Sequence, residues 1–402
     1  MKIPSEIIER PAYLVKIKPF IGKNLIKVLS GQRRVGKSYL LFQLMDTIRQ
    51  QEPDAHIIYI NKEDLAYDFI KTAGDLDAYV RQHSKPGGRN YIFIDEIQDI
   101  DGFEKALRSL LLDECNDLYI TGSNAKMLSG ELATYLSGRY MEFNVYSLSY
   151  PEFLQFHHLE DNEASLAHYV KYGGLPYLIN LPLNDLVFEY LNSIYATIIF
   201  RDVVSRYNLR NSRFLEKLVQ FLADNTGSLF SAKKISDFLK SQQIGTAPNV
   251  VQQYVGYLTS AYIIHEINRY DITGRRIFEI GSKFYFENTG IRNAIIGYRV
   301  NDRGKLLENI VCNHLLYLGY SVKIGILHSL EIDFIAERHG EVLYVQVALR
   351  LESEATIERE FGNLLKIADN YPKLVISEDH FTGSSYQGVQ HLHIREFLIS
   401  AV

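Results

Sequence analysis

Residues 26–50 read IKVLSGQRRVGKSYLLFQLMDTIRQ, and this stretch decides the fold of the first half of the chain. It begins as a short β-branched run, passes into Gly31-x-x-x-x-Gly36-Lys37-Ser38, and continues as an apolar helical pattern. Glycines allow backbone N–H groups to curve around phosphate groups, and the following helix offers its positive N-terminus. The stretch therefore predicts a strand, a phosphate-binding P-loop and a helix.

Within this motif we expect ATP and Mg²⁺ to bind. Lys37 would reach the β- and γ-phosphates, and the Ser38 hydroxyl would be a magnesium ligand. Arg33 and Arg34 lie inside the loop and could contact either the nucleotide or a partner. The expected ATP-binding residues of this segment are Gly31, Gln32, Arg33, Arg34, Val35, Gly36, Lys37, Ser38 and Tyr39.

A second stretch, YIFIDE at 91–96, is an apolar strand that ends in two adjacent acids. Asp95 fits the role of a magnesium-holding carboxylate, and Glu96 fits the role of a base or water-orienting group for attack on the γ-phosphate. Either acid alone would be an ordinary strand-end carboxylate. Together, and behind a P-loop, they predict ATP hydrolysis rather than binding alone.

Further strand-like runs, HIIYIN at 56–61, DLYITGS at 117–123 and YMEFNVYSL at 140–148, alternate with helical patterns. This alternation predicts a parallel sheet covered on both faces. After the fourth strand, Ser123 or Asn124 could sense the γ-phosphate or could cap the next helix. Arg139, before the fifth strand, could neutralise charge on the transferred phosphoryl group within its own subunit or a neighbouring one. An ordinary surface arginine is the alternative.

Length, composition and charge limit the remaining classes. At 402 residues the chain is long enough for two to four domains at roughly 100 to 200 residues each. With a net charge of -5, any nucleic-acid contact needs a local basic patch. The two cysteines, Cys115 and Cys312, are too few for a disulfide framework. No apolar run reaches about 18 residues and the N-terminus has no signal-like segment, so we expect a cytoplasmic protein with no membrane contact.

Taken together, the motifs resemble those of the prokaryotic AAA-like P-loop ATPases that carry a C-terminal domain of unknown function with a restriction-endonuclease-like fold. The resemblance implies MgATP processing by Lys37, Ser38, Asp95 and Glu96, adds weight to Arg139, and names no substrate. The matching segments cover nearly the whole chain in order: VLSGQRRVGKS, YIFIDEIQDI, YITGSNAKMLSGELATYLSGR, YSLSYPEF, YGGLPYL, FRDVVSRY, KFYFENTGIRN, LLENIV, EIDFIA, YVQVALRL and EREFGNLLKIADNYPK.

The middle of the chain predicts a winged helix. Three helical patterns within 211–260 are followed by IIHEINRYDITGRRIFEI, two strand-like runs joined by a turn at Thr273-Gly274. If this module binds DNA, the third helix would enter the major groove and the wing would touch phosphate. The residues concerned would be Asn249, Gln252, Gln253, Arg275 and Arg276. The third helix contains no lysine or arginine, which disfavours phosphate anchoring, and a packing module is the alternative.

From about residue 299, the helix and strand order is that of the restriction-endonuclease core. In that core a helix glutamate, a strand aspartate and an acid-x-lysine pair converge on magnesium, and the matching positions here are Glu308, Asp333, Gln346 and Ala348. Ala348 stands in place of the lysine, which disfavours cleavage because the ammonium normally steadies phosphorane charge. Arg350 stays protonated and cannot act as a base. Glu308, Asp333 and Gln346 therefore form a second, less complete metal-site candidate on what is either a docking or a structural module.

The predicted fold is α/β: a P-loop NTPase parallel sheet, then a winged-helix domain and a C-terminal restriction-endonuclease-like α/β domain. The expected domains are a P-loop ATPase at 1–155, a helical lid or connector at 156–210, the winged helix at 211–298 and the nuclease-like domain at 299–402. The predicted function is MgATP hydrolysis. The alternatives are a nucleotide-gated protein-interaction switch with slow hydrolysis and, third, a magnesium-dependent nuclease. DNA, a protein partner and an oligomer are the partners considered.

Overall fold

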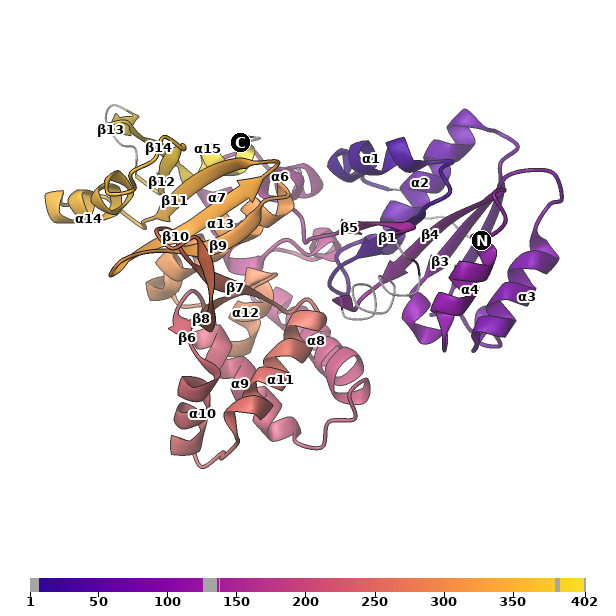
Figure 1. Cartoon of the computed structure of the whole chain (residues 1–402), viewed down its shortest axis with the longest axis horizontal. Coiled ribbons are helices and arrows are strands. Elements are labelled where there is room, and N and C mark those ends of the chain that lie inside the picture. Colours follow the sequence, from indigo (N-terminus) through magenta and orange to yellow (C-terminus); the bar gives the residue numbers. More distant parts are fainter. Residues whose placement is uncertain (1–6, 126–135, 137, 380–383, 401–402) are drawn as a thin grey trace. The chain divides into compact units, whose positions relative to one another are not determined.

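The chain forms two compact units in the computed structural model, which describes residues 7–125, 136, 138–379 and 384–400 (Figure 1). Unit 1 comprises Met1–Tyr146 together with Ser260–Tyr262, and unit 2 comprises Ser147–Thr259 and Ile263–Val402.

Unit 1 is built on a five-stranded parallel sheet with the order β2-β3-β4-β1-β5. The strands are β1 (Ile26–Ser30), β2 (His56–Asn61), β3 (Asn90–Asp95), β4 (Asn116–Gly122) and β5 (Tyr140–Asn144). Every residue of β1, β3 and β4 is buried, as expected where helices cover both faces of a parallel sheet. The predicted P-loop NTPase sheet is confirmed.

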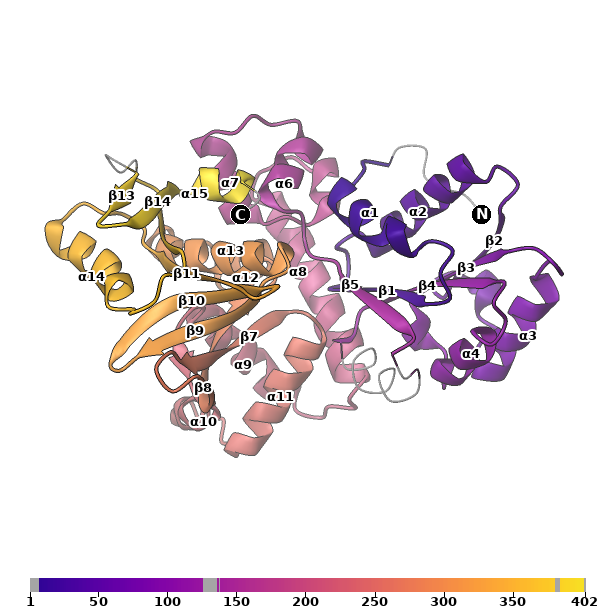
Figure 2. The same cartoon turned by 45° about the horizontal axis from the view of Figure 1, so that its top comes forward.

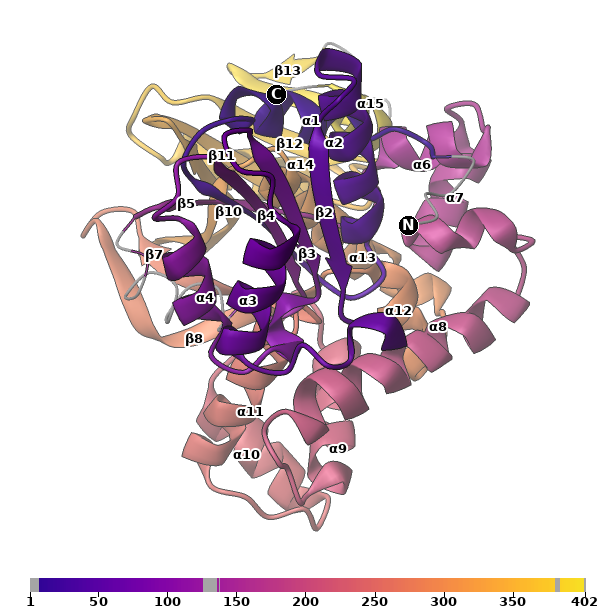
Figure 3. The same ribbon diagram turned by 90° about the vertical axis from the view of Figure 1, so that its right-hand side faces the viewer.

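Among the described residues of unit 1, four helices cover this sheet, with α1 and α2 over one face and α3 and α4 over the other (Figure 3). They are α1 (Pro11–Ile17), α2 (Lys37–Gln51), α3 (Ala73–His83) and α4 (Phe103–Leu110), with 3₁₀ turns at Lys18–Phe20, Leu65–Tyr67 and Ile97–Asp99. The start of α3 is fixed by a capping box, in which Thr72 and Asp75 satisfy each other's backbone N–H groups. Leu76, Val80 and Leu107 then pack on the sheet as part of one buried cluster.

The strand order of unit 1 brings three separate polar segments together. Because β4 lies between β1 and β3, the residues after β4 stand between the loop that follows β1 and the acids that end β3. In a parallel sheet all three carboxyl ends lie at the same edge, which is where such folds place their ligands. The candidate site is therefore assembled at the edge where β1, β4 and β3 end.

Helices occur along the whole sequence of unit 2. They are α6 (Tyr150–His157), α7 (Glu163–Tyr172), α8 (Leu186–Thr197), a π-helical continuation at Ile198–Ser205, α9 (Ser212–Asp224), α10 (Ala232–Ser241), α11 (Pro248–Ser260), α12 (Thr289–Ile296), α13 (Arg303–Tyr317), α14 (Glu354–Leu365) and α15 (Ile394–Ile399), with 3₁₀ turns at Pro176–Asn180 and Val300–Asp302. Helix α6 begins within the range predicted for the P-loop domain, 1–155. The segments from α7 to the π-helix lie in the range 156–210 that was expected to be a helical connector, and α9 lies at the start of the next expected module.

A single nine-stranded sheet runs through unit 2, in the order β13-β14-β12-β11-β10-β9-β7-β8-β6. Its strands are β6 (Leu229–Phe230), β7 (Ile264–Asp271), β8 (Arg276–Phe286), β9 (Ser321–Leu327), β10 (Leu330–Arg338), β11 (Glu341–Val347), β12 (Lys373–Ser377), β13 (Ser385–Tyr386) and β14 (Val389–His393). The hairpin β7–β8 joins the later strands because β7 pairs in parallel with β9 (Figure 2). The sheet therefore continues across the domain boundary expected at 298/299.

The hairpin itself lies where the sequence predicted it. Asp271 ends β7, and its carboxylate accepts hydrogen bonds from the backbone N–H groups of Thr273 and Gly274 at 3.1 and 2.9 Å. Such an aspartate-closed turn reverses the chain into β8. In addition, the short strand β6 pairs antiparallel with β8. Three helices, a small strand between the first two of them and a terminal hairpin thus form one segment of unit 2.

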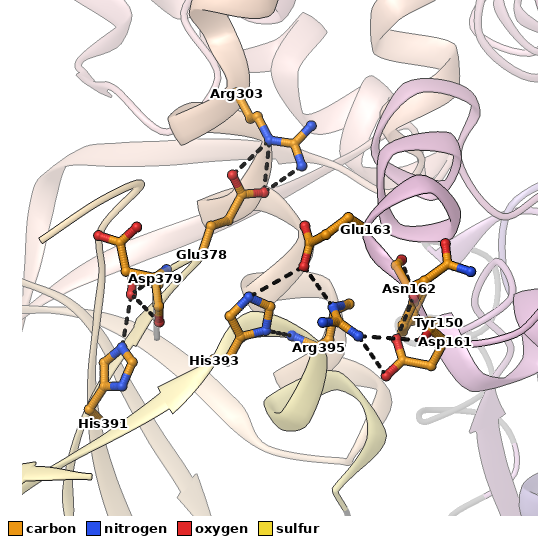
Figure 4. Close-up of polar contacts among 11 residues, drawn as sticks. Tyr150, Asp161, Asn162, Glu163, Arg303, Glu378, Asp379, His391, His393 and Arg395 are labelled. Carbon is orange, nitrogen blue, oxygen red and sulfur yellow. Dashed lines mark hydrogen bonds and ion pairs between the residues drawn. The ribbon is translucent and has the colours of Figure 1, made fainter. Parts of the chain in front are cut away.

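The C-terminal helix α15 is tied to the segment between α6 and α7 (Figure 4). The Arg395 guanidinium donates to Glu163 and to Asp161, each at 3.0 Å, and Tyr150 donates to the same Asp161 at 2.9 Å. His393 lies 3.7 Å from the Glu163 carboxylate. These contacts join the two ends of unit 2 in sequence.

Candidate functional site

The loop after β1 needs glycine at both ends of its motif. At Gly31, φ is +152°, and an added Cβ would lie 2.1 Å from the carbonyl oxygen of Val145. Gly36 has φ of +96°, in the left-handed region that favours glycine, and α2 begins at the next residue. The two glycines therefore allow the chain to close tightly around the loop and to point the first turn of α2 into it.

Lys37 lies in the first turn of α2, and its ammonium is directed into this loop. It donates to the carbonyl oxygens of Gly31 and Gln32, both at 2.9 Å, and the side chain is 4% exposed. Both acceptors are neutral. A phosphate oxygen would be a stronger acceptor than either carbonyl, because hydrogen bonds between ionised partners are about twice as strong as neutral ones. The ammonium is thus held in the loop by contacts that an anion can replace.

Asp95, at the end of β3, is held by hydroxyl groups. It accepts hydrogen bonds from Thr121 on β4 and, at 3.3 Å, from Tyr59 on β2. Burial raises the pKa of Asp95, and hydrogen bonds from Thr121 and Ser38 partly offset this effect. A serine hydroxyl beside a carboxylate is an all-oxygen ligand set, which Mg²⁺ prefers. Ser38 and Asp95 therefore fit the magnesium that was expected to accompany ATP.

Glu96 follows Asp95 with a left-handed backbone, φ +57°, which turns its side chain away from the strand direction. Its carboxylate accepts hydrogen bonds from Gln98 and, at 3.3 Å, from Ser123, and its N–H donates to Thr121 at 2.9 Å. Burial alone would raise the pKa of Glu96, but the charges of Lys37 and Arg33, together with hydrogen bonds from Gln98 and Ser123, lower it below its ordinary value. Glu96 is accordingly held as a carboxylate close to the loop.

Other residues predicted for this site lie in varied surroundings. Arg33 is buried, with its guanidinium 2.8 Å from Glu63 and 3.7 Å from Glu96. Arg34 is exposed, and Arg139 is also exposed at the entry to β5. The remaining residues are Gln32, Val35, Ser123 and Asn124, which are buried, and Tyr39, which is 48% exposed.

Motif reading along the sequence missed two residues that organise this site. Thr121 bonds both the Asp95 carboxylate and the Glu96 backbone, and Gln98 bonds the Glu96 carboxylate. A hydroxyl residue at the end of the fourth strand was visible in the sequence. Its use depended on β4 lying beside β3, which the sequence alone did not fix.

Unit 2 contains a second group of charges, which we call the Lys283 cluster: Lys283, Glu308, Glu331 and Asp333. The Lys283 ammonium on β8 lies 2.8 Å from Glu308 on α13, 2.8 Å from Glu331 and 3.5 Å from Asp333, both on β10. Tyr285 also donates to Glu308, at 2.6 Å. Two of the three residues of the less complete metal candidate, Glu308 and Asp333, therefore share a lysine that the motif did not include.

Burial and charge act strongly on this cluster. Burial alone would lower the pKa of Lys283, but Glu308, Asp333 and Glu331 outweigh it and raise that pKa above its ordinary value. For Asp333, burial and the neighbouring Glu308 charge raise the pKa to about 7, with Lys283 acting in the opposite direction. The cluster is a tight ion network with more negative than positive groups.

The strand that should carry the acid-x-lysine pair has a different role. Gln346 accepts a hydrogen bond from the Asp333 backbone N–H at 3.3 Å. Ala348 is 6% exposed and belongs to an apolar core cluster. Arg350 is exposed and lies 2.6 Å from Glu352, while Lys366 is exposed at the end of α14. The missing lysine position is thus filled by core packing.

The third helix of the expected winged helix, α11, has one exposed polar face. Asn249, Gln252 and Gln253 are exposed on it, whereas Tyr254 is buried on the opposite side. Arg275 and Arg276 at the start of β8 are exposed as well. These are the residues that the DNA-binding interpretation requires to be accessible.

Within the described part of the chain, no helix combines the length and apolar character of a membrane span. Among the same residues, no three His, Cys, Asp or Glu side chains form a metal-binding group by themselves.

The geometry of unit 1 defines the class. A strand, a glycine-bounded loop, a helix that begins with lysine and serine, and an acid pair two strands away are the parts of a P-loop nucleotide-binding α/β protein. Comparison with known families agrees with this class. Residues 23–154 match a family model described as an AAA domain, and residues 163–302 match one described as a domain of unknown function (DUF8612).

Relatives that match most of the chain then define the family. An uncharacterized protein of Haemophilus influenzae is 36% identical over 402 residues, covering 98% of this chain and 99% of its own length. Uncharacterized protein MJ1544 of Methanocaldococcus jannaschii is 30% identical over 352 residues, covering 84% of this chain and 77% of its own. The chain belongs to the same protein family as the Haemophilus influenzae protein, and it carries an AAA domain.

Similarity to solved structures is weaker. The Aeropyrum pernix Orc1 protein in complex with DNA is 15% identical, with a TM-score of 0.34, over 73% of this chain and 93% of that chain. Domain III of the Thermotoga maritima replication initiation protein DnaA is 15% identical, with a TM-score of 0.31, over 47% of this chain and 88% of that chain. The AAA part of the resemblance read from the sequence is confirmed by the match of residues 23–154 to an AAA domain. Its restriction-endonuclease-like part stays a prediction.

Proposed function

We propose that this protein binds MgATP in unit 1 and hydrolyses it. The observation that carries the proposal is the placement of Glu96 as a buried carboxylate, hydrogen-bonded by Gln98 and Ser123, at the same sheet edge as the Lys37 loop. A protein that only bound ATP would need Lys37 and Ser38 but no second acid beside Asp95. The adjacent pair of acids supports hydrolysis.

Each residue then has a defined task. Lys37 exchanges its two carbonyl acceptors for phosphate oxygens and neutralises their charge. Glu96 holds the attacking water and accepts its proton, for which a carboxylate that stays ionised is suited. Ser38 and Asp95 hold Mg²⁺, which supplies charge neutralisation at the phosphates when bound. Ser123 or Asn124 reports the γ-phosphate, and Arg139 neutralises the transferred group.

Measurement of ATP turnover tests this function directly. In Lys37→Ala we expect hydrolysis to fall below detection, a loss on the order of a thousandfold or more, because the phosphate charge is left uncompensated. Lys105 is an exposed lysine on α4, and Lys105→Ala serves as the matched control with unchanged turnover. Hydrolysis by Lys37→Ala at the wild-type rate would sink the proposal.

A second candidate function is a nucleotide-gated switch with slow hydrolysis. It is favoured by the restraint on Glu96, whose carboxylate is already engaged by Gln98, Ser123 and, at 3.7 Å, Arg33. A carboxylate held by three groups must be released before it can orient water. Turnover that stays low with every nucleic acid added, while ATP changes affinity for a protein partner, would favour the switch.

For unit 2 we propose a winged-helix segment followed by a restriction-endonuclease-like module. The element order α9, β6, α10, α11 and the β7–β8 hairpin supports the first, and the order of α13, β9, β10, β11, α14 and β12 supports the second. The exposed polar face of α11 and the exposed Arg275 and Arg276 support DNA contact. DNA binding that is unchanged in Arg275→Ala/Arg276→Ala would argue against the wing as a phosphate contact.

A further inference from the structure

The Lys283 cluster is a group of four charges in unit 2 that the proposed ATPase does not use. Lys283 and Asp333 are buried, whereas the side chains of Glu308 and Glu331 are 17% and 39% exposed. Its four members come from three elements, since Lys283 is on β8, Glu308 on α13, and Glu331 and Asp333 on β10. Lys283 is 4% exposed, so its ammonium has little access to water. An ammonium has three N–H donors, and here three carboxylates surround it.

Three carboxylates around one point are the kind of oxygen ligand that a hard divalent cation prefers, although as they stand they do not form a metal-binding group among the described residues. Calcium is bound by oxygen ligands at about 2.3–2.6 Å, and magnesium at about 2.0–2.1 Å. The Lys283 ammonium is 2.8 Å from both Glu308 and Glu331. These nitrogen–oxygen distances exceed the metal–oxygen distances by a few tenths of an ångström for calcium and by under one ångström for magnesium. Small side-chain shifts would therefore allow a metal ion at the same point.

A divalent ion does not fit beside the ammonium as the residues stand. The Glu308 oxygen that faces Lys283 also accepts from Tyr285, and the other Asp333 oxygen accepts from the backbone N–H of Val347 at 2.9 Å. Gln346 is engaged with the Asp333 backbone. A metal would therefore have to displace the buried ammonium or share its carboxylates at close range, where two positive charges repel strongly. The magnesium that the nuclease-like order implies disagrees with these contacts.

We propose that Lys283 is the resident cation of unit 2, with its ammonium standing where a divalent ion would otherwise bind between Glu308, Glu331 and Asp333. The chain itself then supplies the positive charge at this point, and the nuclease-like module keeps its shape without metal. This inference concerns unit 2 and is independent of ATP hydrolysis in unit 1.

The inference has a direct chemical consequence. Lys283→Met removes the ammonium but keeps the length and apolar stem of the side chain. The three carboxylates are left without a counter-charge, and they become a site for a divalent ion. Wild-type protein, by contrast, has no vacancy for such an ion in this cluster.

Titration of nucleotide-free protein with Mn²⁺ tests whether this site exists. Binding is monitored by calorimetry and by the electron paramagnetic resonance signal of the free ion. We expect Lys283→Met to gain a Mn²⁺ site at least about tenfold tighter than any in the wild type, because uncompensated carboxylates attract the ion. The double variant Lys283→Met/Asp333→Asn should lose that gain. Lys305→Met, which removes a half-exposed lysine from α13, is the matched control and should bind as the wild type does.

Two results would overturn the proposal. One is Mn²⁺ binding by the wild type that disappears in Asp333→Asn, because the metal and Lys283 would then coexist as in a working nuclease. The other is a folded Lys283→Met protein that gains no Mn²⁺ site. Should Lys283→Met fail to fold without metal, Lys283→Gln replaces it, and the wild-type titration with Asp333→Asn decides in either case.

Discussion

Two lysines, one in each unit, are equally buried but differ in the groups nearest to their ammonium groups. Lys37 and Lys283 are each 4% exposed. Lys37 donates to two neutral carbonyl oxygens, whereas Lys283 is surrounded by three carboxylates. An ammonium on neutral acceptors gains by moving to an anionic ligand, while one on carboxylates has no such gain. Burial of a charged group therefore does not by itself identify a ligand site. The charge of the groups that contact it is the more informative property.

The largest expected effect is on the rate of ATP hydrolysis. In Glu96→Gln, ATP hydrolysis should fall by about a hundredfold or more, since general-base groups contribute factors of that size. ATP binding should persist because Lys37 and Ser38 are unchanged, and binding of a fluorescent ATP analogue measures this separately. Glu114→Gln alters an exposed acid of unit 1 and is the control. Full activity in Glu96→Gln would move the chemistry away from this residue.

The next effect concerns stability. Lys283→Met should destabilise unit 2 by about 3 kcal/mol, because breaking a buried ion pair leaves uncompensated charge. Lys37→Met should destabilise unit 1 by less than this, because the hydrogen bonds that it loses go to neutral carbonyl oxygens, and its charge otherwise acts on Asp95 and Glu96. Hydrogen exchange followed by mass spectrometry resolves the two units. Equal losses in both variants would remove the distinction drawn between the two lysines.

A smaller effect should appear as a pH dependence of unit 2. Asp333 has a pKa of about 7 in the folded chain, against about 3.9 when unfolded. The folded state therefore binds the proton more tightly, and the resulting stabilisation is complete below about pH 4 and lost as pH rises through about 7. Between pH 8 and 5.5 the unfolding free energy should rise on acidification by on the order of 1 to 2 kcal/mol relative to Asp333→Asn. Parallel pH curves for the two proteins would contradict this.

The smallest effect is expected where charges are partly exposed. Arg395→Ala removes the ion pairs with Asp161 and Glu163, and such pairs contribute at most about 1 kcal/mol. The thermal unfolding midpoint should therefore move by a few degrees or less, with the exposed Arg350→Ala as control. A loss as large as that in Lys283→Met would mean that burial of the Lys283 cluster adds nothing.

The sequence predicted the P-loop because its residues are neighbours in the chain. Gly31 to Ser38 form a continuous motif, and Asp95 and Glu96 end a strand that is apolar throughout. Thr121 was harder to assign, since its contacts with those acids depend on the strand order. A site residue can be predicted from the sequence when the residues it contacts are close to it in the chain.

Lys283 shows the same limit more strongly. The acid-x-lysine motif places its lysine two positions after Gln346, and there Ala348 packs into the core instead. Lys283 precedes that position by 65 residues in the sequence and reaches Glu308 from β8. Lys283 directly precedes three aromatic residues in KFYF, and a charged residue is unusual next to such an apolar run. Its meaning required the pairing of β7 with β9, a contact between segments far apart in the chain.

That pairing also limits how the protein can be divided for experiments. A fragment ending at residue 298 would contain β7 without β9, so the backbone N–H and C=O groups of Arg269–Asp271 would face water along an open edge. Open edges of this kind pair with other molecules and cause aggregation. A fragment that begins at 299 would leave β9 open in the same way. Fragments intended to remain soluble should therefore keep the hairpin and the later strands together.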